Sequence, residues 1–198
     1  MLKCANTFLL LIIALSTGFT TKLDEVTNYY GIPETLTFDN VDFKLSWSSH
    51  PNATYYKQEY LPKNNTSEHF DDMLIIDFIV TDLSVKDAVG AQIKTLMERK
   101  KTDAICNYSV AKSPDGNEYI LDFLMSESAG DKISIIEWNG YHYKPYTDKA
   151  GHNGVLLFAI SHRAYSDQAI PFLKSLKTYK TEQVTKLLKY PTPEIQLK

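Results

Sequence analysis

The chain reads Lys132-Ile-Ser-Ile-Ile-Glu-Trp138, Asn139-Gly140 and Tyr141-His-Tyr-Lys-Pro-Tyr146 in succession, and this stretch decides the predicted fold. Both longer runs are rich in aromatic and β-branched residues, which favour strands. Asn-Gly between two such runs is the strongest short-range signal for a β-hairpin, because both residues tolerate the positive φ angles of a tight turn. We therefore expect residues 132–138 and 141–146 to pair as antiparallel strands.

A third strand is expected after the polar loop that follows this hairpin. Residues 155–160 are apolar at every position, as in a central strand that is covered on both faces. A second turn signal, Pro114-Asp-Gly-Asn117, separates two further strand-like runs at residues 105–111 and 118–125. These signals together predict an antiparallel sheet, with a three-stranded meander in residues 131–163.

Two helices are expected beside the sheet. Ser84 is a good N-cap, and Asp87 places a negative charge in the first turn, where it suits the helix dipole. The apolar stripe of this helix recurs every four residues, at Val85, Val89, Ile93 and Met97, with Ala88 and Leu96 beside them. Ser166-Asp167 can begin a C-terminal helix, either in one piece or in two pieces split near Thr181, whose stripe is Leu173, Leu176, Val184, Leu187 and Leu188. The predicted class is α+β, an antiparallel sheet with hairpins and a meander packed against an amphipathic helix and a C-terminal helix.

The composition fits a single globular domain. A chain of 198 residues with 43% hydrophobic residues is long enough for one core of its own. The formal net charge of −3 is mild. One dense cationic run, Arg99-Lys100-Lys101, falls at the expected end of the first helix, where cations complement the helix dipole. We therefore expect no nucleic-acid partner.

The N-terminus has the order of a secretory signal peptide. Lys3 supplies a positive charge, residues 8–15 form an unbroken apolar run, and small residues follow up to Gly18. We expect residues 1–18 to be removed, and the soluble protein to be periplasmic or secreted. The apolar run is far shorter than the ~20 residues that span a bilayer, and an uncleaved signal anchor is the other interpretation.

After cleavage, one domain is expected at residues 35–190, between a flexible leader at residues 19–34 and a loose tail at residues 191–198. No segment of this mature chain is expected to span a membrane. Cleavage leaves Cys106 as the single cysteine, which excludes an internal disulfide. Because this thiol lies in a strand-like run, we expect it to be buried and unreactive.

The order of elements resembles the Mog1/PsbP-like α/β/α sandwich: strands, one amphipathic helix, an antiparallel meander and a C-terminal helix. The resemblance covers residues 35–190 and rests on the helix after Ser84 and the meander in residues 131–163, without a signature motif. It implies a protein that binds or assists other components, as many proteins of this group do. It carries over no functional residue, because a fold alone does not fix a function.

Four aromatic side chains crowd the predicted hairpin, namely Trp138, Tyr141, Tyr143 and Tyr146. Alternate residues of a strand share a face, so Tyr141 and Tyr143 are expected to stand side by side. If exposed, such an aromatic patch would suit another protein or an apolar ligand. Packing of the same side chains into the core explains the pattern equally well.

Three histidines recur at intervals of ten residues, namely His142, His152 and His162. If strands and loops bring them together, they can hold a metal ion with one position open, as in a catalytic zinc site. The alternative is that they are ordinary exposed histidines. Ser161 and His162 are adjacent on a strand and point to opposite faces, so they cannot form a nucleophile–base pair.

Asp77 and Asp122 interrupt apolar strands and are the best candidates for a carboxylate with a perturbed pKa, although each can equally face solvent. The sequence contains no specific catalytic motif and implies no cofactor. We expect an exported, non-enzymatic binding or accessory domain that contacts its partner through the aromatic hairpin. The alternative is a metal-dependent hydrolase built on the three histidines.

Overall fold

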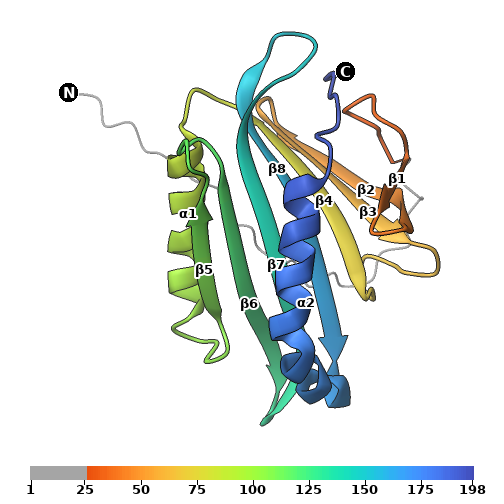
Figure 1. Cartoon of the computed structure of the whole chain (residues 1–198). Coiled ribbons are helices and arrows are strands. Elements are labelled where there is room, and N and C mark those ends of the chain that lie inside the picture. Colours follow the sequence, from red (N-terminus) through yellow and green to blue (C-terminus); the bar gives the residue numbers. More distant parts are fainter. Residues whose placement is uncertain (1–25) are drawn as a thin grey trace.

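Within residues 26–198, which the computed structural model describes, eight strands form one antiparallel sheet in the order β1-β2-β3-β4-β8-β7-β6-β5 (Figure 1). The strands are β1 (Thr35–Phe38), β2 (Val41–Asn52), β3 (Tyr55–Pro62), β4 (Asp72–Val80), β5 (Asn107–Lys112), β6 (Tyr119–Ala129), β7 (Lys132–Thr147) and β8 (Asn153–Tyr165). The helices are α1 (Val85–Arg99) and α2 (Ala169–Lys189), with the short 3-10 helix η1 (Ser166–Gln168) before α2. The predicted α+β class with an antiparallel sheet is confirmed.

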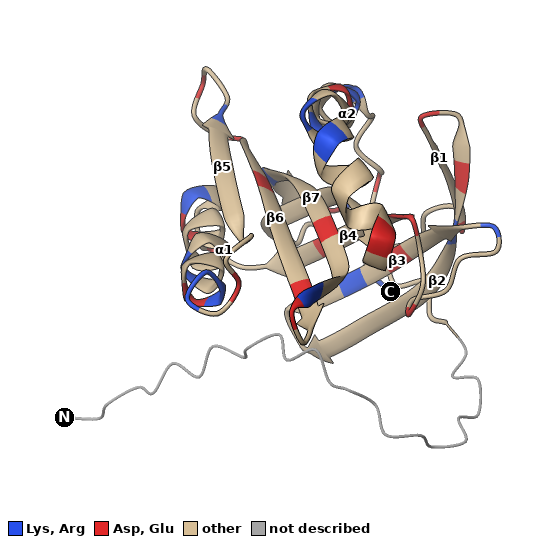
Figure 2. Ribbon diagram, turned by 90° about the horizontal axis from the view of Figure 1, so that it is seen from below, with Lys and Arg blue, Asp and Glu red and all other residues tan. Residues whose placement is uncertain are grey.

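The two helices lie on opposite faces of the sheet, which curves around α2 (Figure 2). α1 contacts β5, β6 and β7, whereas α2 contacts β7 and β8. Each face has its own apolar core, and β8 contributes to both. Residues 155–160 of β8 are all buried and alternate between the two cores. This confirms the prediction of a central strand that is covered on both faces.

The predicted turn at Asn139-Gly140 is wrong, because both residues lie inside the continuous strand β7. Asn139 is 1% exposed, and its side-chain amide donates to Glu137 at 3.0 Å and accepts from the Ser161 hydroxyl at 2.5 Å. At Gly140 an added Cβ would meet the Trp138 ring at 2.7 Å, so glycine leaves room for the indole. Pairing with β6 on one side and β8 on the other outweighs the local turn preference of Asn-Gly.

The hairpin turns lie at other positions. Gly130-Asp131 connects β6 to β7, and Gly130 has a φ of 63°, so the meander consists of β6, β7 and β8. The predicted turn at residues 114–117 does connect β5 to β6, and Gly116 has a φ of 80°. Asp39 and Asn40 connect β1 to β2 with φ values of 52° and 62°, the two positive angles that a tight hairpin turn requires.

α1 begins where its N-cap predicts. The Ser84 hydroxyl accepts from the backbone N–H of Asp87 at 3.2 Å and donates to the Asp87 carboxylate at 2.6 Å. The predicted apolar stripe is wrong at its last member, because Met97 is 55% exposed. Gly90 is also exposed, with open space where a Cβ would lie. The residues of α1 that are buried are Val85, Val89 and Leu96.

α2 is one uninterrupted helix of 21 residues. Phe172 and Leu187 are buried against the sheet. Three further members of the predicted stripe, Leu173, Leu176 and Val184, are partly buried in the same core. Leu188 is 52% exposed, so the prediction that it belongs to this stripe is wrong.

Both ends of the described chain pack onto the core. Tyr30, in the expected flexible leader, is fully buried. Ile195 is also fully buried, and the next backbone N–H, at Gln196, donates to the Tyr30 carbonyl at 2.9 Å. The expectation of a loose tail is therefore wrong. The predicted signal peptide and residues 19–25 lie outside the described residues. No helix within residues 26–198 is long and apolar enough to span a membrane.

Candidate functional site

The four aromatic residues predicted to form one patch are divided between the two faces of β7. Trp138 and Tyr146 belong to the core on the α2 side, whereas Tyr141 and Tyr143 belong to the core on the α1 side. Trp138 is 1% exposed, and Tyr143 is 5% exposed. The Tyr146 hydroxyl donates to the carbonyl of Pro193 in the tail at 3.0 Å. These side chains therefore do not form one shared exposed surface.

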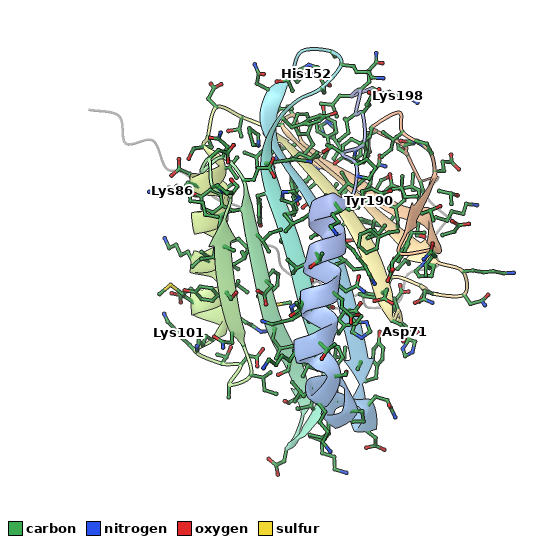
Figure 3. All side chains as sticks on the ribbon, viewed as in Figure 1. Asp71, Lys86, Lys101, His152, Tyr190 and Lys198 are labelled. Carbon is green, nitrogen blue, oxygen red and sulfur yellow. The ribbon has the colours of Figure 1, made fainter. Side chains whose placement is uncertain are left out.

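The three histidines predicted as an alternative metal site do not converge. Each ring contacts a different carboxylate: His142 contacts Glu118 at 2.7 Å, His152 contacts Asp148 at 3.1 Å, and His162 contacts Asp72 at 2.8 Å. Figure 3 shows His152 in the loop between β7 and β8. Asp72, the partner of His162, follows Asp71, which the same figure shows well away from that loop. Among the described residues, no group of three His, Cys, Asp or Glu side chains is placed to hold a metal ion.

Asp122, one of the two carboxylates singled out in the sequence, is satisfied by its neighbours. It lies on β6, on the α2 side, and accepts from Lys180 at 3.0 Å, from Ser109 at 2.8 Å and from the Trp138 indole at 3.3 Å. Lys180 belongs to α2. Asp122 therefore connects the helix to the sheet, and this structural role accounts for its position.

Asp77, the other carboxylate, is only partly satisfied. It lies on β4, on the α1 side, and is 8% exposed. Its Oδ2 accepts from the Tyr55 hydroxyl at 2.8 Å. Its Oδ1 is buried and has no hydrogen-bond partner within the part of the chain that the structure describes. Buried carboxylate oxygens in native proteins are nearly always paired, so this oxygen is a candidate binding group.

Burial raises the pKa of Asp77 to about 6, against the opposing effects of the Lys57 charge and the Tyr55 hydrogen bond. The carboxylate is therefore mostly ionised at neutral pH. Burial and the charge of Asp77 raise the pKa of Tyr55, whose hydroxyl stays protonated and available as a donor. Of the two interpretations of Asp77 from the sequence, its burial favours the carboxylate with a perturbed pKa over the one that faces solvent.

A half-buried ion pair lies directly beside Asp77. Lys57 on β3 is the cross-strand partner of Asp77, and its Nζ lies 3.0 Å from the carboxylate of Glu59. Both side chains of this pair are 15% exposed. Burial alone would lower the pKa of Lys57, but Asp77 and Glu59 outweigh it and the pKa is raised. Lys57 is therefore a cation that two carboxylates share.

Aromatic rings flank the carboxylates from β7. Burial, followed by the charge of Asp77, raises the pKa of Tyr141 well above its ordinary value, and Glu137 and Glu59 add to the effect. Burial, followed by the neighbouring Tyr141 and the charge of Asp77, also raises the pKa of Tyr143 well above its ordinary value. Both hydroxyls stay protonated, so the two rings provide neutral aromatic surface beside Asp77.

These residues form what we call the Asp77 cluster: Tyr55, Lys57, Glu59, Asp77 and Tyr141. The cluster lies on the α1-side face, but on β3, β4 and β7, while α1 itself contacts β5, β6 and β7. The helix therefore covers the half of the face next to β5, and the centre of the cluster lies in the other half. An acceptor, a cation and an aromatic ring are thus brought together on the face beside the helix.

The sequence indicated Asp77 and Tyr141 but missed Tyr55, Lys57 and Glu59. The three missed residues alternate along one strand, so their spacing placed them on one face. Their position opposite Asp77 depends on the pairing of β3 with β4, which sets Lys57 against Asp77. That register is a property of two strands, and no local pattern in either strand reveals it.

Comparison with known proteins places most of the chain in one family. A model of a protein family of unknown function matches residues 30–192. No curated protein and no solved structure matches the chain. The matched residues include all eight strands, both helices and the whole Asp77 cluster.

Proposed function

We propose a ligand-binding function for this chain, which belongs to the protein family whose model matches residues 30–192. The observation that carries the proposal is the buried Oδ1 of Asp77, which lacks a partner among the described residues. A buried polar atom without a hydrogen bond costs about 1–3 kcal/mol, and more when it is charged. A ligand that donates to Oδ1 removes this cost, so the site favours occupation.

The Asp77 cluster is suited to recognition rather than to reaction, which supports a non-enzymatic role. The Tyr55 hydroxyl donates to Asp77 at 2.8 Å and stays protonated, so it orients the carboxylate and is no nucleophile. Lys57 is held by Glu59 and keeps its proton. Together these residues form a fixed acceptor beside an aromatic ring, an arrangement that is typical of a binding site.

The proposal keeps part of the predicted aromatic surface. Tyr141 and Tyr143 lie on the same face as Asp77, whereas Trp138 and Tyr146 stabilise the opposite core. The ligand or partner protein expected from the sequence would therefore contact Tyr141, which is half-buried. The centre of the binding surface moves from the predicted hairpin to β3 and β4.

Export is part of the proposed function. Its support is the signal-peptide pattern of residues 1–18, and we place the mature protein in the periplasm or outside the cell. N-terminal sequencing of the exported protein should give a start between Phe19 and Lys22. An intact chain that begins at Met1 in the membrane fraction would instead support a signal anchor.

We also propose kinship with the Mog1/PsbP-like sandwich at the level of the fold. Its support is the layering of α1 and α2 on opposite faces of one antiparallel sheet (Figure 2). An accessory role in binding other components, which that resemblance implies, agrees with a non-enzymatic ligand site. An experimental structure whose strand order and helix layers differ from those of that sandwich would contradict the kinship.

The binding function is tested by mapping ligands onto the sheet. Wild-type protein is titrated with a library of small fragments, and changes in amide and side-chain NMR signals are recorded. We expect the responding signals to cluster at Tyr55, Lys57, Asp77 and Tyr141, and to be lost in Asp77→Asn. Fragments that bind only elsewhere, or that bind Asp77→Asn equally well, would contradict the proposal.

A further inference from the structure

The charges of the Asp77 cluster do not balance. Asp77 is a buried carboxylate and Glu59 a half-buried one, and Lys57 is the one cation of the cluster, in contact with Glu59 at 3.0 Å. The neighbouring Glu137 is paired with Arg163 at 2.5 Å, so that pair adds no net charge. At neutral pH the cluster therefore holds a net charge of −1, in a place where an uncompensated charge is unfavourable.

The unpartnered atom specifies the kind of group that the cluster lacks. Oδ1 of Asp77 is an acceptor, so its partner must present an N–H or O–H group. Because the cluster lacks one positive charge, a cationic donor completes it, whereas a neutral donor leaves the charge uncompensated. Hydrogen bonds between an ionised carboxylate and a cationic N–H are also stronger than those with a neutral donor.

The surroundings of Asp77 specify the rest of the ligand. Across the sheet from Asp77 lies Leu157 on β8, followed by Tyr143 on β7. Ala159 and Tyr141 form the next row, and the Tyr141 ring packs edge-on against Phe123 at 4.8 Å between centroids. Leu157 and Ala159 are 5% and 0% exposed, so the half-buried Tyr141 ring is the part of these rows that a ligand can reach. Aromatic rings attract cations through their faces and also pack against apolar groups.

We propose that the Asp77 cluster binds a small protonated amine, a monocation that has at least one N–H group and is attached to an apolar or aromatic body. This inference rests on the proposed binding function and names its ligand class. The ammonium group donates to Oδ1 of Asp77, Lys57 stays with Glu59, and each carboxylate then has its own cation. The body of the ligand lies against the half-buried ring of Tyr141.

Entry of the amine requires movement of a side chain, because Oδ1 of Asp77 is closed to solvent. Lys57 is the side chain best able to move, since it is long and has several rotatable bonds. Its Nζ lies 5.8 Å from the centre of the Trp47 ring, and Trp47 is 41% exposed.

Replacing Lys57 by Met keeps the apolar stem of the side chain and removes the cation that competes with the ligand for Asp77. This variant should therefore bind the amine more tightly than wild type does.

The test uses three probes of similar shape in isothermal titration calorimetry at pH 7.5. They are 2-phenylethylammonium, its N,N,N-trimethyl derivative, which is cationic but has no N–H, and 2-phenylethanol, which is neutral. We expect 2-phenylethylammonium to bind best, and each comparator to bind about tenfold or more weakly, because each lacks either the charge or the donor. Asp77→Asn should bind 2-phenylethylammonium about tenfold or more weakly than wild type does. Glu68 is an exposed carboxylate on the β3–β4 loop, so the control variant Glu68→Gln should bind the amine like wild type.

The outcomes separate this inference from the function on which it rests. Equal binding of the alcohol and the amine, lost in Asp77→Asn, would overturn the amine class and leave a ligand site at Asp77. Binding of the trimethyl derivative as tightly as the amine would show that charge alone is recognised, which also overturns the inference. If no probe binds and fragments still map to the cluster, the amine class is wrong and the binding function stands. If fragments do not map there either, both are wrong.

Discussion

Replacing Asp77 by Asn should stabilise the ligand-free protein at neutral pH and leave its stability nearly unchanged in acid. The substitution keeps the shape of the side chain and removes the charge. The folded protein raises the pKa of Asp77 from 3.8 to about 6, with burial as the largest cause. One pKa unit corresponds to about 1.36 kcal/mol, so the ionised Asp77 destabilises the folded state by about 3 kcal/mol.

The sign of the pH dependence follows from the raised pKa. Between pH ~4 and ~6 the folded protein holds the Asp77 proton more tightly than the unfolded chain does, so stability falls as the pH rises through this window. Below this window Asp77 is protonated in both states, and its charge has no effect. The gain in the free energy of unfolding from Asp77→Asn should therefore develop between pH ~4 and ~6 and stay constant above pH ~6.

Urea denaturation of both proteins at pH 4 and pH 7.5 measures this difference. Other groups with shifted pKa values contribute in both proteins, so they cancel in the comparison; His142, whose pKa burial lowers, is one of them. Asp122→Asn is the matched control, because that carboxylate has three donors and should lose stability at both pH values. If Asp77→Asn and wild type keep the same difference in stability at both pH values, the charge of Asp77 is fully compensated, and the reasoning is refuted.

Three further substitutions test the packing on which the site depends, each by chemical denaturation. Gly90→Ala should raise the free energy of unfolding by up to ~1 kcal/mol, because the position is exposed, helical and open; a loss would show a hidden contact. Gly140→Ala should lower it by about 1–3 kcal/mol, since the new Cβ would lie 2.7 Å from an indole ring; an unchanged value would show that the ring moves freely. Leu96→Ala should cost about 2–5 kcal/mol and Met97→Ala much less, because Leu96 is 1% and Met97 55% exposed; equal costs would contradict the assigned face of α1.

Local signals in the sequence were enough to locate both helices and the strands β5, β6 and β8. α1 begins at its predicted N-cap because Ser84 and Asp87 satisfy each other within one turn of chain. The turn at residues 114–117 is also local, and it was predicted correctly. In these cases the stabilising contacts lie within a few residues of each other, so a short window of sequence contains them.

Contacts between distant segments explain what the sequence did not reveal. Asn139-Gly140 has the composition of a turn, but its residues are satisfied by Ser161 on β8 and covered by Trp138. Asp77 was visible as a polar residue in an apolar strand, whereas its partners come from β3, in a register that only the sheet defines. Tertiary pairing thus overrode local propensity at the predicted hairpin, and it also created the Asp77 cluster.

The most direct test of the Asp77 site is the NMR titration of the Asp77 carboxyl carbon, in the free protein and with 2-phenylethylammonium at saturation. We predict a pKa of about 6 for the free protein. We predict a lower pKa with the amine, because a bound cation favours the ionised carboxylate. A pKa near the ordinary value of 3.8 in the free protein would contradict a buried, partly unpaired carboxylate. A pKa that does not change at saturation would contradict contact between the amine and Asp77.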